Sequence, residues 1–139
     1  PTASKILKRF AKDGYLEQRA ERRHLIFTLR TNNEEVVDLN KLYWKQKLQK
    51  LSQEFQAKLT GAGGILFGSL AKAEAKSDSD IDLAIFAPEK KTMDIKHFEK
   101  SLGRKISVYW FKSLSEVKNE HLRNNILNGV LLFGRLKWS

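Results

Sequence analysis

A glycine and a serine followed, after ten residues, by two aspartates form the pattern in this chain best suited to chemistry. Gly68 and Ser69 come first, and Asp80 and Asp82 follow with one residue between them. Carboxylates on alternate residues of a strand project from the same face and can share hard cations such as Mg²⁺. Mg²⁺ takes its other ligands from water and phosphate oxygens, so the pair predicts a metal site that handles phosphates.

The Gly-Ser pair suits the phosphate side of such a site. A Gly-Ser turn between a strand and a helix brings backbone N–H groups and a hydroxyl close to a phosphate, and the helix N-terminus favours anions. The pieces together fit phosphoryl or nucleotidyl transfer. The alternative is an exposed strand face, but the strand that carries Asp80 and Asp82 is apolar enough to be central, and a buried acid needs a partner.

Strands and helices must position these residues. We expect strands over 65–67, 80–86, 105–111 and 130–133 and a helix over 93–102. The period of two within 80–86 places Asp80, Asp82, Ala84 and Phe86 on one face and Ile81, Leu83 and Ile85 on the other. Ser113 and Glu116 match a capping box for a further helix that ends near Gly129.

The segment from Gly68 to Asp82 resembles the signature of the polymerase-beta-like nucleotidyltransferases, in particular the minimal nucleotidyltransferases of prokaryotes. The resemblance covers about 65–135, including the core over 79–83 and the pattern over 126–134. It implies an α+β fold, with a mixed β-sheet flanked by helices.

The resemblance also implies roles for the residues of the motif. It places Gly68 and Ser69 at the nucleotide and Asp80 and Asp82 at Mg²⁺, as catalytic residues. Lys72 keeps a positive charge for the phosphates where the family often has Arg, and Ala73 replaces a common glycine. ATP or another nucleoside triphosphate is the expected substrate.

A third carboxylate, which active members of the family generally carry on a neighbouring strand, is not evident here. The matching position in 105–111 is Ser107, which has neither the charge to hold a cation nor the basicity of a carboxylate. Two carboxylates can still hold one Mg²⁺, and Glu116 is an alternative source of the third acid. Tyr109 and Trp110 are candidates for stacking on a base, although aromatic residues on strands are more often core.

The N-terminal segment is basic. Lys and Arg total 26 against 16 Asp and Glu, giving +10, and residues 1–31 carry eight basic against three acidic residues, which is +5. Such a balance favours nucleic acid, nucleotides or acidic surfaces as partners, although a solvated lysine-rich surface is the simpler interpretation. A helix with Ala3, Ile6, Leu7 and Phe10 on one face precedes two expected strands, 15–16 and 24–30, joined by the charged segment 18–23.

Residues 1–35 resemble the recognition helix and wing of a winged helix-turn-helix domain, as joined to nucleotidyltransferases in archaeal proteins. The resemblance implies DNA contacts from five residues: Lys5, Lys8, Arg9, Arg22 and Arg23. The alternative is a solvated basic helix packed on the catalytic domain. Only part of a winged helix is present and no initiator Met opens the chain, so we expect a piece of a longer protein.

A long helix over 36–60 is expected to link this segment to the nucleotidyltransferase domain over 61–139. Its apolar stripe consists of Trp44, Leu48, Leu51, Phe55 and Leu59 at helical spacing. This stripe and the apolar face of the first helix make a homodimer a further hypothesis.

Composition excludes several classes of protein. The chain has no Cys, which removes disulfides and thiolate metal sites, and its three His are too far apart for a zinc motif. No apolar run reaches the roughly 18 residues of a membrane span, so we expect a cytoplasmic protein. Two functions stay open: a Mg²⁺-dependent enzyme that transfers a nucleoside monophosphate to a hydroxyl on a protein, nucleic acid or small molecule, or an inactive nucleotidyltransferase fold that acts as a DNA-binding, antitoxin-like regulator.

Overall fold

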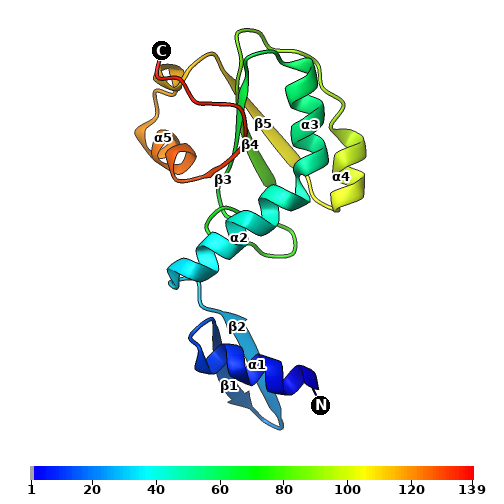
Figure 1. The fold of residues 1–139 in the computed structure, drawn as a ribbon, viewed down its shortest axis with the longest axis vertical. Coiled ribbons are helices and arrows are strands. Elements are labelled where there is room, and N and C mark those ends of the chain that lie inside the picture. The colour runs from blue at the N-terminus through cyan, green and yellow to red at the C-terminus, as the bar shows by residue number, and fades with distance from the viewer. Residues whose placement is uncertain (1) are drawn as a thin grey trace. The chain divides into compact units, whose positions relative to one another are not determined.

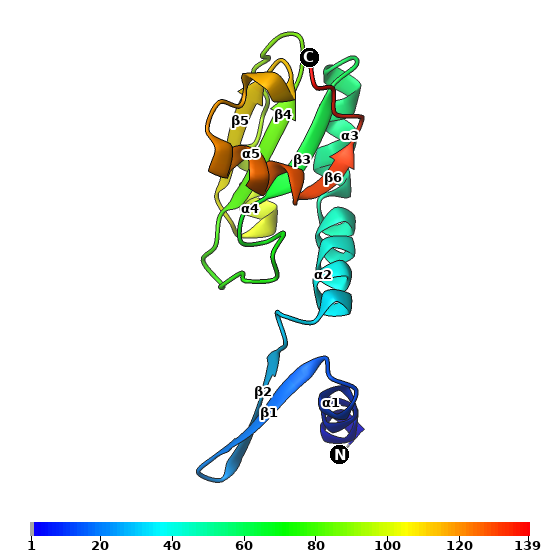
Figure 2. The same ribbon diagram turned by 90° about the vertical axis from the view of Figure 1, so that its left-hand side faces the viewer.

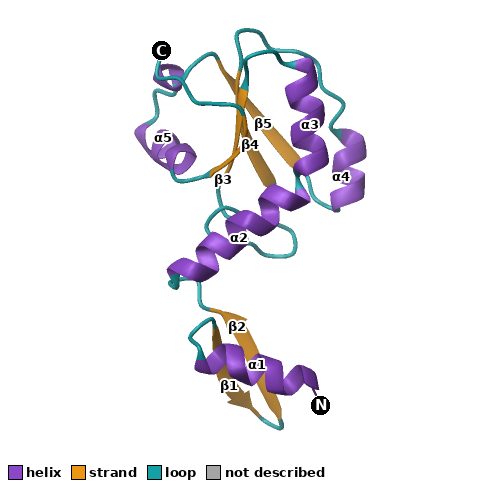
Figure 3. Ribbon diagram, in the orientation of Figure 1, coloured by secondary structure: helices purple, strands orange, loops and turns teal. Residues whose placement is uncertain are grey.

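The computed structural model describes residues 2–139, which form two compact units. The first, which we call the N-terminal unit, ends at Leu39, and the second, the C-terminal unit, spans Asn40–Ser139. Figure 1 shows the elements in chain order, and Figure 3 distinguishes the helices, strands and loops by colour. None of the helices in residues 2–139 has the length and apolar character required to cross a membrane.

The N-terminal unit consists of a helix and a β-hairpin, followed by the start of a second helix. Helix α1 spans Thr2–Lys12, and strands β1 (Leu16–Glu21) and β2 (His24–Leu29) pair antiparallel. Glu21 pairs with His24, so the turn consists of Arg22 and Arg23 alone. The expected pair of strands is therefore present, but most of the charged segment over 18–23 belongs to the first strand and not to the connection.

Helix α2, Glu34–Lys47, starts in the N-terminal unit and ends in the C-terminal unit. Asn33 caps it, because its side-chain oxygen accepts hydrogen bonds from the backbone amides of Glu35 (2.9 Å) and Val36 (3.3 Å). The Asn33 amide group donates to the carbonyl of Gly14 at 2.9 Å, and the Tyr15 hydroxyl donates to Glu35 Oε2 at 2.6 Å. These contacts fasten the start of α2 to the junction between α1 and β1.

The C-terminal unit contains a four-stranded mixed sheet in the order β5-β4-β3-β6. The strands are β3 (Gly63–Phe67), β4 (Ile81–Phe86), β5 (Ile106–Phe111) and β6 (Val130–Phe133). β4 pairs antiparallel with β3 and parallel with β5, and β6 pairs antiparallel with β3. The α+β architecture with a mixed sheet, expected from the resemblance, is confirmed.

Helices cover both faces of this sheet (Figures 1 and 2). Helices α3 (Gln49–Lys58) and α4 (Lys96–Leu102) lie on one face and α5 (Glu120–Leu127) on the other. The first face buries Ile81, Leu83 and Ile85 of β4, whereas Ala84 and Phe86 belong to the cluster on the second face. The predicted alternation of β4 is therefore confirmed, and Asp82 lies on the α5 face.

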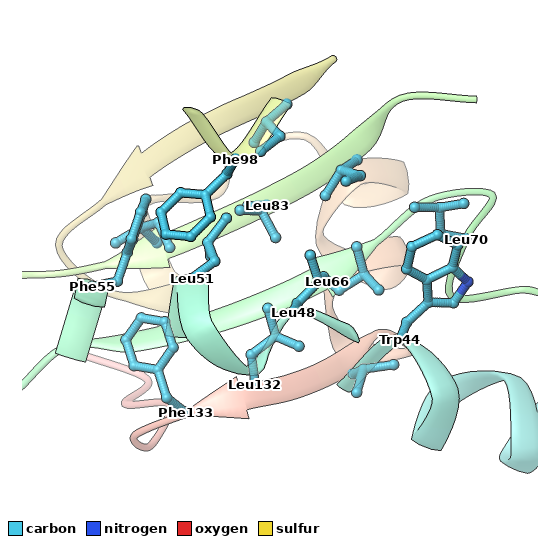
Figure 4. Close-up of a cluster of buried hydrophobic side chains, with 14 of the residues drawn as sticks. Trp44, Leu48, Leu51, Phe55, Leu66, Leu70, Leu83, Phe98, Leu132 and Phe133 are labelled. Carbon is cyan, nitrogen blue, oxygen red and sulfur yellow. The ribbon is translucent and has the colours of Figure 1, made fainter. Parts of the chain in front are cut away.

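The expected helix over 36–60 is divided into α2 and α3 at Leu48. Leu48 has φ −96° and ψ 12°, outside the usual helical angles, and its carbonyl accepts hydrogen bonds from both the amide and the side-chain hydroxyl of buried Ser52, each at 2.9 Å. All five residues of the apolar stripe are nevertheless buried in the main core cluster, and Figure 4 shows Trp44, Leu48, Leu51 and Phe55 within it. The stripe is thus part of the chain's own core and is not available as a dimer surface.

Two other helix boundaries differ from expectation. Helix α4 begins at Lys96 and not at residue 93. The capping box at Ser113 and Glu116 is wrong: Ser113 precedes a short 3₁₀ turn, Leu114–Glu116, which Glu116 ends. The helix that follows is capped by Asn119, whose Oδ1 accepts from Leu122 N at 2.9 Å. The amides of Leu114 and Ser115 are bonded to the C-terminal segment, at the carbonyls of Lys137 (3.0 Å) and Trp138 (2.8 Å).

Candidate functional site

The end of β3 and the start of β4 bring Gly68 against Asp82. Phe67, the last residue of β3, is the register partner of Asp82, and Gly68 follows it with φ +80°. A Cβ at Gly68 would lie 2.7 Å from Asp82 Oδ2, so that any other residue here would force the carboxylate to move. Glycine is therefore needed here both for its backbone angle and for the space that the carboxylate occupies. The structure brings the two ends of the sequence motif together.

Residues 69–79 form turns that connect β3 to β4, and no helix follows Ser69. The Ser69 carbonyl accepts hydrogen bonds from the amides of Lys72 (3.2 Å) and Glu74 (3.0 Å). The helix expected after the Gly-Ser turn is thus absent, since the turns over 69–73 do not extend into a helix. Ser69 is half-buried beside Gly68, and Lys72 is exposed on the loop.

Ala73 lies in the left-handed region with φ +59°. Glycine adopts this conformation without cost, whereas a left-handed alanine is destabilised by roughly 1–2 kcal/mol. The position at which the sequence has alanine in place of a common glycine is therefore one where glycine would be preferred. The chain therefore keeps this turn although the alanine backbone is strained there.

The environment of Asp82 disfavours its charge. Asp82 is half-buried at the second position of β4, while Asp80 is exposed just before the strand. Burial raises the pKa of Asp82 above its usual value, and the negative charge of Asp80 raises it further. A divalent cation beside these oxygens would offset both effects, and oxygen ligands are those that Mg²⁺ prefers. The donor set therefore fits a hard cation.

Ser107 lies beside Asp82 across the parallel pair of strands. The two residues are register partners, so their side chains project from the same face of the sheet. Within residues 2–139, no three His, Cys, Asp or Glu side chains gather in a way that could hold a metal ion. The position expected for a third carboxylate is thus occupied by a neutral, half-buried hydroxyl group.

Glu116 does not take the place of the third acid. It follows the end of β5 marked by the register pair Phe86 and Phe111, whereas Asp82 lies near the start of β4, at the opposite end of the sheet. Its Oε2 atom accepts a hydrogen bond from the Lys112 amide at 2.8 Å, which gives it a local structural role.

Of the two aromatic candidates on β5, only Tyr109 shares a face with Asp82. Tyr109 is 41% exposed and its ring centroid is 5.4 Å from that of Phe67 in an edge-on contact. Trp110 projects to the other face and packs against the main core cluster. The core interpretation therefore holds for Trp110, while Tyr109 presents part of its ring near the carboxylates.

Two residues that the sequence did not suggest hold the loop over 69–79. Arg104 Nη1 donates hydrogen bonds to the carbonyls of Lys76 (2.9 Å) and Ser79 (2.8 Å), and the Asn40 amide group donates to the Leu70 carbonyl. Both contacts join residues at least 25 positions apart. No local sequence signal could have revealed them.

The basic residues of the N-terminal unit are exposed. Lys5, Lys8 and Arg9 lie on α1, and Arg22 and Arg23 form the tip of the hairpin. Helix α1 has no buried residue, and Ile6, Leu7 and Phe10 are partly open as well. The unit therefore presents both charge and apolar surface to its surroundings.

Comparison with known protein families gives a match over most of the C-terminal unit. The family model described as "Polymerase beta, Nucleotidyltransferase" matches residues 46–137, which include α3, the whole sheet and the motif from Gly68 to Asp82. No curated protein and no solved structure gave a significant match. The matched range covers about two thirds of the chain and leaves out the N-terminal unit.

Proposed function

The chain belongs to the polymerase beta nucleotidyltransferase family, and we propose that it transfers a nucleoside monophosphate from a nucleoside triphosphate, such as ATP, to a hydroxyl acceptor with the help of Mg²⁺. The observation that carries this proposal is the contact of the Gly-Ser turn with Asp82, where a Cβ at Gly68 would lie 2.7 Å from Oδ2. This contact places the Gly-Ser turn, which suits phosphates, beside the carboxylate of Asp82, which suits a cation.

Each residue of the motif has a role in this proposal. Asp80 and Asp82 hold Mg²⁺, which, when bound, neutralises charge on the phosphates of the nucleotide. The backbone of Gly68 and Ser69, together with the Ser69 hydroxyl, binds the phosphates. Lys72 attracts them with its charge. In phosphoryl transfer most of the catalysis comes from positioning and electrostatic stabilisation, which these groups supply.

Ser107 limits what the site does to the acceptor. A hydroxyl group neither adds a third negative charge for the cation nor accepts a proton as a carboxylate does. General base catalysis typically contributes about 10²–10⁴-fold to a rate. We therefore expect this chain to be a slow nucleotidyltransferase. Without a carboxylate at position 107, the acceptor hydroxyl loses its proton to water and not to a protein side chain.

A second candidate function is favoured by Ser107 and the basic N-terminal unit together. In it, the nucleotidyltransferase fold binds nucleotide without turnover, and the N-terminal unit binds DNA through Lys5, Lys8, Arg9, Arg22 and Arg23, as a regulator of antitoxin type. The exposure of these five side chains supports the idea. The two functions are compatible, since a DNA-binding unit can deliver an enzyme to its target.

Calorimetric titration of Mg²⁺-ATP and Mg²⁺-GTP tests the first proposal without knowledge of the acceptor. The parent should bind one of them, and Asp80→Asn and Asp82→Asn should each lose the binding that depends on Mg²⁺. Asp78→Asn is the matched control, because Asp78 is exposed in the same loop and has no assigned role.

The enzyme proposal fails if a folded parent binds neither nucleotide, and the regulator then becomes the leading candidate. If binding is present, transfer of labelled nucleotide to candidate acceptors follows, with the same three variants. Undiminished transfer in Asp80→Asn or Asp82→Asn would show that the site has been assigned to the wrong residues.

A further inference from the structure

The loop between Gly68 and Asp82 contains both halves of the proposed site but little structure of its own. Residues 74–78 are all exposed, and the local hydrogen bonds beyond residue 74 join only Lys76 and Ser79, through Ser79 N to Lys76 O at 3.1 Å and Lys76 N to Ser79 Oγ at 2.8 Å. A segment with few buried contacts opens easily. Its conformation therefore depends on groups outside it.

Arg104 supplies the main outside contact for the second half of the loop. It follows Gly103, which ends α4 in the left-handed conformation and turns the chain towards β5. From there Arg104 Nη1 donates to the carbonyls of Lys76 and Ser79, at 2.9 and 2.8 Å. One guanidinium nitrogen thus joins the carbonyls of the first and last residues of the turn over 76–79.

The Arg104 side chain is itself held in place by Trp44. The centre of its guanidinium group lies 5.3 Å from the centroid of the indole ring, within the range of a cation–π contact. Trp44 is 7% exposed and belongs to the main core cluster. The Arg104 side chain is therefore already ordered by the core. It loses less conformational entropy than an exposed arginine would when it forms hydrogen bonds to the loop.

The contacts of residues 104 and 105 fix the backbone on both sides of Asp80. Its preceding peptide group contributes the Ser79 carbonyl, which accepts from Arg104, and its following peptide group contributes the Ile81 amide, which donates to the Lys105 carbonyl at 2.8 Å. Asp80 lies outside β4 and its side chain is exposed, yet both of its peptide groups are bonded to the segment 104–105.

We propose that Arg104 is a positioning residue that fixes Asp80, and the loop before it, in the conformation that binds the metal and the nucleotide. This inference rests on the proposed function, because it assumes a nucleotide site at Asp80 and Asp82. The hydrogen bonds from Arg104 to the loop end on backbone carbonyls. The Asn40 contact with the Leu70 carbonyl secures the first half of the same loop.

Limited trypsin digestion measures the first part of the proposal. Cleavage after Lys76 requires its carbonyl to leave Arg104 and enter the protease. We expect Arg104→Gln and Arg104→Lys to be cleaved there about tenfold faster than the parent, since a hydrogen bond from a charged donor changes an opening equilibrium by about tenfold or more. The control is Lys100→Gln, which removes an exposed charge from α4, and the peptide ending at Lys76 is quantified by mass spectrometry.

Mg²⁺-ATP affinity, measured by calorimetry on the same proteins, tests the second part. Arg104→Gln should bind about tenfold more weakly, and Arg104→Lys should lie between it and the parent, because lysine keeps the charge but not the planar fork. The melting temperature of each variant shows whether the fold is retained. A merely structural arginine would change the melting temperature and leave the affinity of the folded protein unaltered.

Two outcomes overturn the proposal while the proposed function stands. Cleavage after Lys76 at the parent rate in both variants would show that Arg104 does not hold the loop, and faster cleavage with unaltered Mg²⁺-ATP affinity would show that the held loop does not position the site. A parent that binds no Mg²⁺-ATP is a different result, because it removes the proposed function itself and this inference with it.

Discussion

The two units of this protein use their apolar residues in opposite ways. In the C-terminal unit the apolar stripe over 44–59 and nearly all residues of the central strands β3 and β4 are buried, and Phe55 and Leu83 are 0% exposed. In the N-terminal unit α1 has no buried residue, and Phe10 is 44% exposed. The C-terminal unit thus carries its candidate site on a packed core, whereas the N-terminal unit leaves its apolar side chains partly exposed. The contrast indicates that most of the buried core lies in residues 40–139, and it agrees with the proposal that the N-terminal unit acts through its surface.

The difference in burial between the two units is tested most strongly by replacing one phenylalanine in each unit with alanine. Phe55→Ala leaves a cavity among buried side chains and should lower the free energy of unfolding by about 3–5 kcal/mol. Phe10→Ala removes a half-exposed ring and should cost less than about 1 kcal/mol. Urea unfolding followed by circular dichroism measures both. Similar losses for the two variants would mean that α1 is buried in the folded protein in solution.

The stripe around Phe55 also shows what sequence alone could establish. The spacing of Trp44, Leu48, Leu51, Phe55 and Leu59 predicted which face is buried, and the structure confirms each residue. It did not predict the division at Leu48, where the backbone departs from helical angles, because the spacing of the stripe is the same with or without that departure. Periodicity reports the buried face more reliably than it reports the continuity of a helix.

Long-range hydrogen bonds account for what the sequence missed. Ser113 and Glu116 have the types and spacing of a capping box, but the amides of Leu114 and Ser115 are bonded to the carbonyls of Lys137 and Trp138. Arg104 likewise acts on residues far away in the sequence. By contrast, the register of Asp82 with Ser107 agrees with the alignment inferred from the resemblance, since it depends on local strand patterns.

The Ser107→Asp variant tests whether a third carboxylate is all that the site needs for faster nucleotidyl transfer. Aspartate at this position would lie beside Asp82 and could accept a proton from a hydroxyl acceptor. We expect pyrophosphate release from Mg²⁺-ATP, with glycerol as acceptor, to rise by about a hundredfold, the lower end of the usual gain from general base catalysis. Ser107→Asn, similar in size but uncharged, is the control and should release pyrophosphate at the parent rate. An equal gain in both variants would exclude a role for the charge.

Gly68→Ala tests whether the site depends on the space beside Asp82. The substitution should cost roughly 1–2 kcal/mol of stability through the backbone angle and should also weaken Mg²⁺-ATP binding, because the new Cβ displaces the carboxylate. Gly61→Ala is a close control, since Gly61 has φ +73° but nothing lies within 4 Å of an added Cβ. Calorimetry and thermal unfolding separate the two effects. Equal nucleotide affinities in the two variants would contradict the assigned contact.

Neutralising the hairpin tip sharpens the other side of the comparison. If the N-terminal unit binds DNA, Arg22→Gln/Arg23→Gln should weaken binding and reduce the slope of log affinity against log salt by about two units, roughly one for each lost phosphate contact. Fluorescence anisotropy with a duplex oligonucleotide at several salt concentrations gives the slope. Lys90→Gln/Lys91→Gln, which removes two exposed charges from the C-terminal unit, is the control. Equal slopes in the two double variants would favour diffuse attraction over a binding surface on the hairpin.

The smallest expected effect concerns the contact that fastens α2 to the N-terminal hairpin. The hydrogen bond from the Tyr15 hydroxyl to Glu35 raises the pKa of Tyr15 above its usual 10.0, and the charge of Glu35 acts in the same direction. A raised pKa means that the folded state favours the protonated phenol, so the stabilisation is complete below pH 10 and disappears as the pH rises through the folded-state pKa.

Tyr15→Phe removes this contact and should be slightly less stable than the parent at pH 7, with the difference vanishing above the raised pKa. Thermal unfolding of both proteins from pH 7 to 11 measures it, and Tyr43→Phe, at an exposed tyrosine of α2, corrects for the general effects of alkaline pH. A difference that persists at pH 11 would show that Tyr15 acts through its ring contact with Phe10, at 6.2 Å between centroids, and not through its hydroxyl. The N-terminal unit would then depend on apolar packing after all, and its contrast with the C-terminal unit would be one of degree.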